Sequence, residues 1–317
     1  PLIDSMRTAL FTLPGISDSI WTELSIWNRS FAHRIRTDSV VPTVNKSPYK
    51  FRYILQKRTK DSPLAIIYPS IGEGIKSHHS VVFAKMFYDL GYSVIIQGSS
   101  FQWEFAQSMP DNYTPGLPKN DAEELKKISG MIIEMLQDKY KYKFTNRVIL
   151  GTSFGALTAL FVADSENKDN TLNITKFISI NPPIELFYAM KEVDKNGEEW
   201  ALNPDGLKDK VALAAAKILK LYNQKDEKNF KIESLPFNDY EAKLITGFVM
   251  HQKLSDLLFV IEKIPDNKKS EFYNTINDTN FQDYLKKYII KDNLLAYDEL
   301  NFDSSLYSIS DYLESGN

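Results

Sequence analysis

The sequence predicts an α/β fold in which helices cover both faces of a mostly parallel, doubly wound sheet. Between residues 50 and 183, short apolar runs alternate with segments of helical spacing. This alternation is typical of parallel strands joined by crossover helices. After residue 183 the apolar residues follow helical spacing, without a further buried strand. We therefore expect an N-terminal helical segment (1–49), an α/β core (50–183) and a helical cap with a C-terminal segment (184–317).

The N-terminal segment and the start of the core differ in their apolar spacing. Trp21, Leu24, Trp27 and Phe31 recur at intervals of three and four residues, which predicts a helix within residues 2–36. From Lys50 the residues alternate between apolar and polar, which predicts a half-exposed strand. The change of period places the start of the sheet close to residue 50.

The remaining core elements follow in regular order. Continuous apolar runs predict buried strands at residues 64–68, 92–97, 147–150 and 177–180. Helical spacing predicts helices at residues 80–90, 121–139 and 154–164. We expect Gly91 to end the first of these helices. Asp121 is the expected N-cap of the second, because Glu124 follows it three residues later as in a capping box.

Composition excludes several classes of function. The 317 residues include 38 Lys and Arg against 41 Asp and Glu, so the net charge is −3 and no nucleic-acid partner is expected. The absence of cysteine excludes disulfides, thiolate metal sites and cysteine nucleophiles. The four histidines lack the spacings typical of His-based metal sites. We expect no metal and no cofactor.

The N-terminus and the apolar runs bear on the cellular compartment. The chain begins with Pro1 rather than Met. This start is compatible with a removed signal peptide of a periplasmic or exported protein, and equally with trimming of a cytoplasmic one. No apolar run reaches the roughly 18 residues that a membrane span needs, so no transmembrane segment is expected. The compartment and the oligomeric state stay open.

The motif with the clearest chemical meaning is Gly151-Thr152-Ser153-Phe154-Gly155, which has the pattern G-x-S-x-G. It directly follows a predicted strand and opens a predicted helix. In so tight a turn the serine adopts strained backbone angles, and the two glycines leave room for the neighbouring backbone. Ser153 is therefore the candidate nucleophile. The helix N-terminus offers free N–H groups to an oxyanion, and the N–H of Phe154 is the expected first donor.

With this elbow, residues 50–183 resemble the first part of an α/β-hydrolase domain, from its second to its sixth strand. The elbow is the one specific motif of the resemblance. It implies hydrolysis of a carboxylic ester, thioester or amide, or acyl transfer, through an acyl-serine intermediate. In that family a helical cap often follows the sixth strand, and residues 184–290 fit this position. We expect an esterase-like or lipase-like serine hydrolase acting on a small-molecule acyl substrate.

The Gly-rich turn at residues 69–74 follows the predicted strand 64–68. The resemblance places a second oxyanion donor in this turn. If Gly72 takes the place of the glycine in the family's His-Gly pair, the donor is the N–H of Glu73, with the register open by one residue. A turn without a catalytic role is the alternative.

The sequence departs from the family in its catalytic partners. The family's order is serine, then an acid after the seventh strand, then a histidine after the eighth. Neither strand is recognisable here. His251 is the only histidine after Ser153, and it lies on or beside the apolar face of a predicted helix, so it is a packing residue or a weak candidate base. His78 and His79 follow the Gly-rich turn as helix-start residues or substrate contacts.

Three explanations follow. The chain is a fragment whose last two strands, acid and histidine are missing. Alternatively, it is a catalytically inactive binding or scaffold protein on the same fold, or an unorthodox base serves Ser153. The missing Met favours the first explanation. So does the edge of a sheet that ends at the sixth strand, because only the helical segment would cover it.

Aromatic residues near the expected site suggest an acyl pocket. Candidates for its lining are Phe101, Trp103, Phe187 and Tyr188, which are equally compatible with a plain core. The long segment 98–120 contains three prolines and Gly116, and we expect it to frame the entrance.

Overall fold

The computed structural model describes residues 29–196, 209–210, 212–213, 216–217, 239–262, 272, 275–276 and 278–290. The chain forms two compact units. The first comprises Pro1–Trp27 and Lys191–Gln252. The second, called the sheet unit below, comprises Asn28–Met190 and Lys253–Asn317. Two helices, α8 (Leu186–Lys195) and α11 (Asp239–Ile261), have residues in both units.

The sheet unit contains a six-stranded mixed sheet with the order β1-β2-β4-β3-β5-β6. Its strands are β1 (Arg36–Val40), β2 (Tyr49–Ile54), β3 (Asp61–Tyr68), β4 (Ser93–Ile96), β5 (Lys143–Thr152) and β6 (Ile174–Ile180). Strand β2 runs antiparallel to β1 and to β4, whereas β4, β3, β5 and β6 are parallel. The predicted α/β class is confirmed, and β1 and β2 make the sheet mixed.

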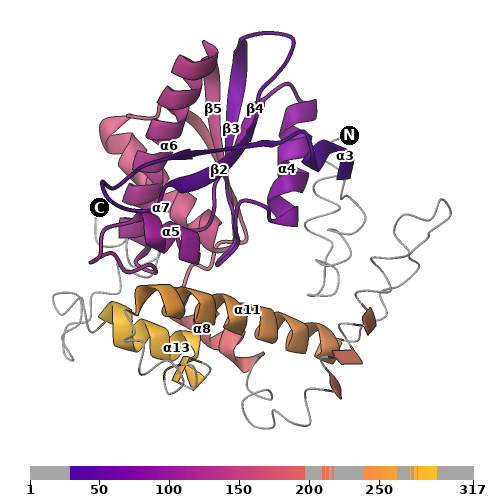
Figure 1. The fold of residues 1–317 in the computed structure, drawn as a ribbon, viewed down its shortest axis with the longest axis vertical. Helices are drawn as coiled ribbons and strands as arrows, with labels where there is room; N and C mark the ends of the chain where they lie inside the picture. The colour runs from indigo at the N-terminus through magenta and orange to yellow at the C-terminus, as the bar shows by residue number, and fades with distance from the viewer. Residues whose placement is uncertain are drawn as a thin grey trace. The chain divides into compact units, whose positions relative to one another are not determined.

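Helices cover both faces of this sheet. The helical elements that lie wholly within the sheet unit are α3 (Arg29–Ala32), α4 (His78–Asp89), α5 (Trp103–Ser108), α6 (Pro118–Tyr140), α7 (Phe154–Asp169), α13 (Phe281–Tyr284) and a π-helical turn η2 (Leu285–Ile290). Helix α4 lies on one face, and α6 and α7 lie on the other (Figure 1). The central strands β3 and β4 are consequently buried on both sides, which explains their continuous apolar runs.

Two elements differ from the sequence-based prediction. Strand β1 lies where the helical segment was expected, and the predicted helix within residues 2–36 falls largely outside the described residues. Only Val40 of β1 is buried, so this edge strand lacks an apolar pattern. Helix α6 begins at Pro118 rather than after Asp121, because proline at the first helical position already has the required φ angle. Asp121 is therefore a buried first-turn residue and not the N-cap.

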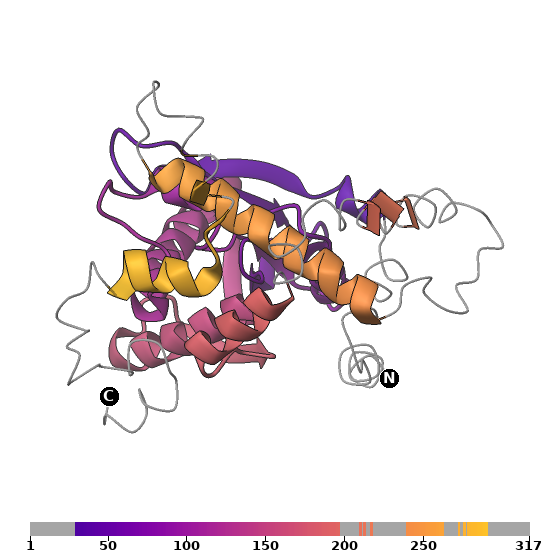
Figure 2. The same ribbon diagram turned by 90° about the horizontal axis from the view of Figure 1, so that it is seen from below.

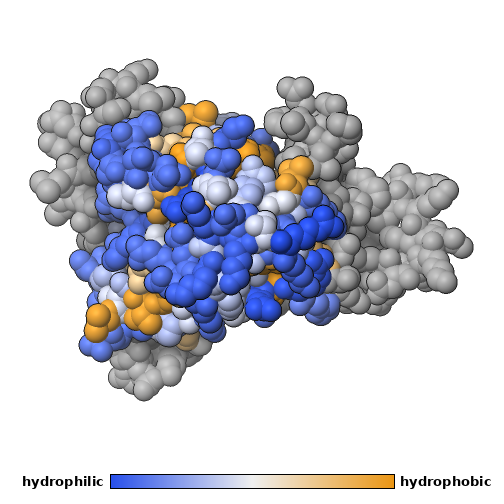
Figure 3. Space-filling model, turned by 90° about the horizontal axis from the view of Figure 1, so that it is seen from above, coloured by the Kyte–Doolittle hydropathy of each residue, from blue (hydrophilic) through white to orange (hydrophobic). Residues whose placement is uncertain are grey.

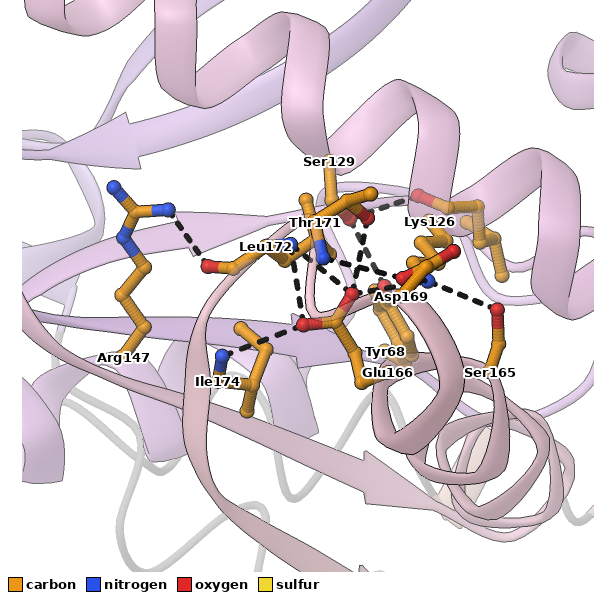
Figure 4. Close-up of polar contacts among 11 residues, drawn as sticks. Tyr68, Lys126, Ser129, Arg147, Ser165, Glu166, Asp169, Thr171, Leu172 and Ile174 are labelled. Atoms are coloured by element: carbon orange, nitrogen blue, oxygen red, sulfur yellow. Dashed lines mark hydrogen bonds and ion pairs between the residues drawn. The ribbon is translucent and has the colours of Figure 1, made fainter.

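A buried ionic cluster joins α6, α7 and the start of β6 (Figure 4). Lys126 Nζ lies 3.0 Å from Glu166 Oε1 and also contacts Asp169. Glu166 accepts the backbone N–H of Leu172 at 3.0 Å. Burial raises the pKa of Glu166, but the Leu172 N–H and Lys126 outweigh it, so the net pKa lies below the ordinary value. The cluster fixes the turn between α7 and β6.

The helix α13 lies beside the C-terminal part of α11 in two perpendicular views (Figure 2). Lys287 Nζ of η2 lies 3.2 Å from Glu262 Oε1, which directly follows α11. Within the sheet unit this part of α11 buries Leu254, Leu257 and Leu258. These contacts bring the end of α11 into the same unit as the sheet.

Surface polarity varies over the molecule. The face seen from above is mostly hydrophilic, with apolar side chains in small groups (Figure 3). One described helix contains a window, Lys243–Ile261, that is long and apolar enough to cross a membrane, and 28% of that window is buried. The core helix of a soluble protein passes the same test, so the finding is weak evidence for a span. It nevertheless qualifies the expectation that no such segment exists.

Candidate active site

Ser153 occupies a sharp turn between β5 and α7. Its backbone angles are φ 52° and ψ −122°, a region that side-chain-bearing residues rarely adopt. The turn is held by hydrogen bonds on both sides. The Ser153 N–H donates to the Ile180 carbonyl at 2.9 Å, and the Ser153 carbonyl accepts the Ala156 N–H at 2.9 Å. The serine predicted to be the nucleophile therefore lies on the strained strand-to-helix turn that the motif requires.

The two elbow glycines are required by close backbone contacts. A Cβ atom on Gly151 would lie 2.2 Å from the Gly155 carbonyl oxygen. One on Gly155 would lie 2.3 Å from the Pro69 carbonyl oxygen and 2.4 Å from that of Tyr68. Backbone atoms cannot move aside as a flexible side chain can. Both positions therefore exclude any side chain, which explains the spacing of the motif.

Ser153 is the N-cap residue of α7, and its side chain makes no capping hydrogen bond. The side chain is half-buried, and no residue in the described part of the chain hydrogen-bonds its Oγ. The N–H of Phe154, the first residue of α7, likewise has no acceptor among the described residues. Such N–H groups, together with the partial positive charge of the helix end, stabilise a negative charge in front of the helix. The arrangement suits an oxyanion.

The loop after β3 lies against the elbow. Strands β3 and β5 are parallel neighbours, with Tyr68 opposite Gly151. Ser70 Oγ lies 3.2 Å from Thr152 Oγ1, and either hydroxyl can be the donor. The predicted turn is thus beside the candidate nucleophile, although the residues that establish its contact, Ser70 and Thr152, were not singled out from the sequence.

The expected donor in this loop is already engaged. The N–H of Glu73 donates to the Ser70 carbonyl at 3.1 Å and closes a turn. It therefore differs from the free oxyanion donor that the sequence suggested. The N–H of Ile71, two residues closer to β3, has no acceptor among the described residues. Gly72 adopts a positive φ of 63° in this turn. The identity of the second oxyanion donor stays a prediction.

The side chain of Glu73 has close polar neighbours. Ser77 Oγ donates to Glu73 Oε2 at 2.8 Å, and His79 Nδ1 lies 3.5 Å from Glu73 Oε1. Burial raises the pKa of Glu73, but His79, Lys253 and Ser77 outweigh burial, so its net pKa lies below the ordinary value. A carboxylate is thus retained beside the elbow, with a histidine next to it.

The long segment after β4 is pinned to a buried carboxyl group. Asp121 accepts hydrogen bonds from Ser100 Oγ at 2.9 Å, Tyr113 Oη at 2.5 Å and the Gly116 N–H at 3.0 Å. Burial raises its pKa to about 6 despite these donors. Tyr284 Oη of α13 donates to the Pro115 carbonyl at 2.7 Å. The segment is therefore anchored at several points along its length.

The predicted acyl-pocket residues have different environments. Phe101 is fully buried and packs against the rings of Phe154, Phe281 and Tyr284, so it is a core residue that supports the elbow. Trp103 and Tyr188 are exposed, and Phe187 is half-buried. A pocket of about 480 Å³ lies between α6 and α7 around Lys126 and Asp169. It is at the C-terminal end of α7, away from the elbow at the start of that helix.

The histidines have no established catalytic geometry. His78 and His79 begin α4 and are half-buried. His251 is half-buried in α11 and belongs to the compact unit that does not contain Ser153. Its role as a base stays a prediction. Among the residues described, no group of three His, Cys, Asp or Glu side chains is suited to holding a metal ion.

No family model and no curated protein matches the chain. Among solved structures, it is similar to an esterase from Pyrococcus furiosus, with 16% identity and a TM-score of 0.35 over 54% of this chain and 59% of that one. A Pyrobaculum calidifontis esterase gives 16% identity and a TM-score of 0.40 over 56% and 54%. A carboxyl esterase from Bacillus coagulans gives 10% identity and a TM-score of 0.36 over 78% and 87%.

The match spans little more than half the length of the two archaeal esterases. These similarities carry no statement about the activity of this chain. In this chain itself, the elbow lies at the end of β5, which has a parallel strand on each side, and it opens α7. The described sheet and elbow are consistent with an α/β-hydrolase fold.

Proposed function

We propose that the protein is a serine hydrolase of carboxylic esters that acts through an acyl-serine intermediate. The observation that carries the proposal is the strained backbone of Ser153, the N-cap residue of α7, whose hydroxyl has no hydrogen-bond partner among the described residues. Backbone strain of this kind costs stability and is concentrated at functional sites. Thioesters and amides are the related substrates that the same chemistry admits.

In the proposed reaction, Ser153 Oγ attacks the carbonyl carbon of the ester and gives up its proton to a base. The resulting oxyanion accepts hydrogen bonds from the N–H of Phe154 and, we infer, from the N–H of Ile71. Both N–H groups lack acceptors among the described residues, and both stand at the same edge of the sheet. Collapse of the intermediate expels the alcohol with a proton, and water then releases the acid and regenerates the serine.

The test is hydrolysis of p-nitrophenyl acetate, butyrate and octanoate by the full-length protein. We expect Ser153→Ala to lower kcat by about 10³-fold or more, because the nucleophile is lost. Ser39→Ala, on the exposed edge strand β1, is the matched control and should retain the wild-type rate. A folded wild-type protein that hydrolyses no ester, thioester or amide would instead support a catalytically inactive binding protein.

The proton acceptor is tested separately with His79→Gln and His251→Gln. His79 is next to the Glu73 carboxylate, the pairing that orients a catalytic imidazole in serine hydrolases. In the wild type, kcat/KM should rise with pH as the catalytic histidine loses its proton. The variant that lacks this histidine should no longer show that rise. If both variants keep the wild-type pH profile, neither histidine is the base of Ser153.

A further inference from the structure

Lys253 of α11 lies across the loop that follows β3. A Cβ atom on Gly72 would lie 2.9 Å from the Cβ and from the Cδ of Lys253, so the aliphatic stem of the lysine covers this glycine. Lys253 Nζ donates to the Ile71 carbonyl at 3.4 Å. Both contacts lie within the sheet unit. The lysine thus touches the two residues that follow Ser70 in the loop.

The backbone around Lys253 is held by its neighbours. Leu254 and Leu257 are fully buried and Leu258 is 1% exposed, so this part of α11 packs firmly within the sheet unit. The backbone cost of ordering Lys253 is therefore already met by the packing of the helix, and only the side chain has to be ordered. Lys253 is therefore able to restrain the loop instead of merely following its movements.

The positive charge of Lys253 complements the negative charge of Glu73 in the loop. Burial works against ionisation of Glu73, while the positive charge of Lys253 favours it. The Glu73 carbonyl in turn accepts the Ser99 N–H at 2.8 Å. The loop is consequently held from α11, from the segment after β4, and through Ser77 and His79 at the start of α4.

We propose that Lys253 is a positioning residue that holds Ile71 so that its N–H completes the oxyanion hole of Ser153. This inference rests on the proposed function. A bond to the Ile71 carbonyl fixes the residue whose N–H is the second donor, and the stem over Gly72 blocks movement of the loop toward α11. Misplacement of a catalytic group by about 1 Å can cost up to about 100-fold in rate.

The test compares Lys253→Met, which keeps most of the stem and removes the charge and the donor, with Lys253→Arg, which keeps both. Lys243→Met is the matched control, because Lys243 is an exposed lysine on the same helix. With p-nitrophenyl butyrate we expect Lys253→Met to lower kcat about 10-fold with KM changed less than about twofold. Lys253→Arg should restore most of kcat, and Lys243→Met should match the wild type.

Hydrogen–deuterium exchange of residues 69–77 is measured on the same proteins. Lys253→Met should speed exchange of this peptide, and Lys243→Met should not. The inference would be overturned if Lys253→Met had the same exchange rate and the same kcat as the wild type. It would also be overturned if Lys243→Met lost as much kcat as Lys253→Met. A wild-type protein without esterase activity contradicts the proposed function. The exchange measurement then still decides whether Lys253 holds the loop.

Discussion

The residue types at the elbow are dictated by the tight turn between β5 and α7, and they were predictable from the sequence. Gly151 is required by a contact four residues along the chain, whereas Gly155 is required by the carbonyls of Pro69 and Tyr68 after and at the end of β3, and the spacing of the motif indicates both. The N–H of Ile71, which we propose as the second oxyanion donor, was not predictable in the same way. Gly72 has a positive φ for a turn covered by Lys253, and nothing local distinguishes that role from a catalytic one.

Replacement of Gly155 tests the close approach of β3 to the elbow. Gly155→Ala would place a methyl group 2.3 Å from the Pro69 carbonyl oxygen. We expect the free energy of unfolding to fall by about 3 kcal/mol or more. Gly130→Ala is the matched control in α6, where the added Cβ meets Leu172 at an ordinary 3.5 Å. It should raise the stability by about 0.5–1 kcal/mol. If urea denaturation gave the same change in unfolding free energy for Gly155→Ala and Gly130→Ala, the close approach of β3 to the elbow would be contradicted.

The raised pKa of Asp121 leads us to expect that the stability of the protein depends on pH. Its pKa in the folded protein is about 6, above the ordinary value of 3.8, so the folded state binds this proton more tightly than the unfolded state. The stability that protonation contributes is complete below pH 3.8 and is lost as the pH rises through about 6.

The comparison is with Asp121→Asn. Relative to this variant, the wild type should lose up to about 3 kcal/mol of unfolding free energy between about pH 4 and pH 7. Urea denaturation across this range measures the difference, with the exposed Asp89→Asn as control. A difference between wild type and Asp121→Asn that is independent of pH would contradict the assigned burial.

Among the elements, the buried ones were predictable and the edge was not. Strands β3 and β4 have continuous apolar sequences because both of their faces are covered. Strand β1 has one buried residue, so its sequence does not differ from that of a polar loop. The start of α6 was misplaced because Asp121 has the chemistry of an N-cap. In the structure the Asp121 carboxylate instead accepts hydrogen bonds from the segment in front of the helix, donated by Ser100, Tyr113 and Gly116.

The contact between α6 and α7 depends on a buried charge. Lys126 and Glu166 are almost completely buried, and removing one partner leaves the other unpaired. We expect Lys126→Met to lower the free energy of unfolding by about 3–5 kcal/mol. Lys168→Met removes an exposed pair with Asp164 on α7 and should cost no more than about 0.5 kcal/mol. Equal costs in chemical denaturation would show that burial does not determine the effect.

At the scale of the whole molecule, the order of the core was predictable and its division into units was not. Parallel strands joined by helices follow from local apolar spacing. The return of Lys253–Ile261 to the sheet unit depends on contacts with residues nearly two hundred positions earlier, such as that between Lys253 and Ile71. Periodicity identifies α11 as a helix and carries no information about which unit its ends join.

The central claim, that Ser153 is a reactive nucleophile, is tested most directly by fluorophosphonate labelling of the full-length protein with peptide mass mapping. The account predicts one adduct per chain on the peptide that contains Ser153, and none in Ser153→Ala. A folded wild-type protein that stays unlabelled, or that carries the adduct on a different residue, would contradict it.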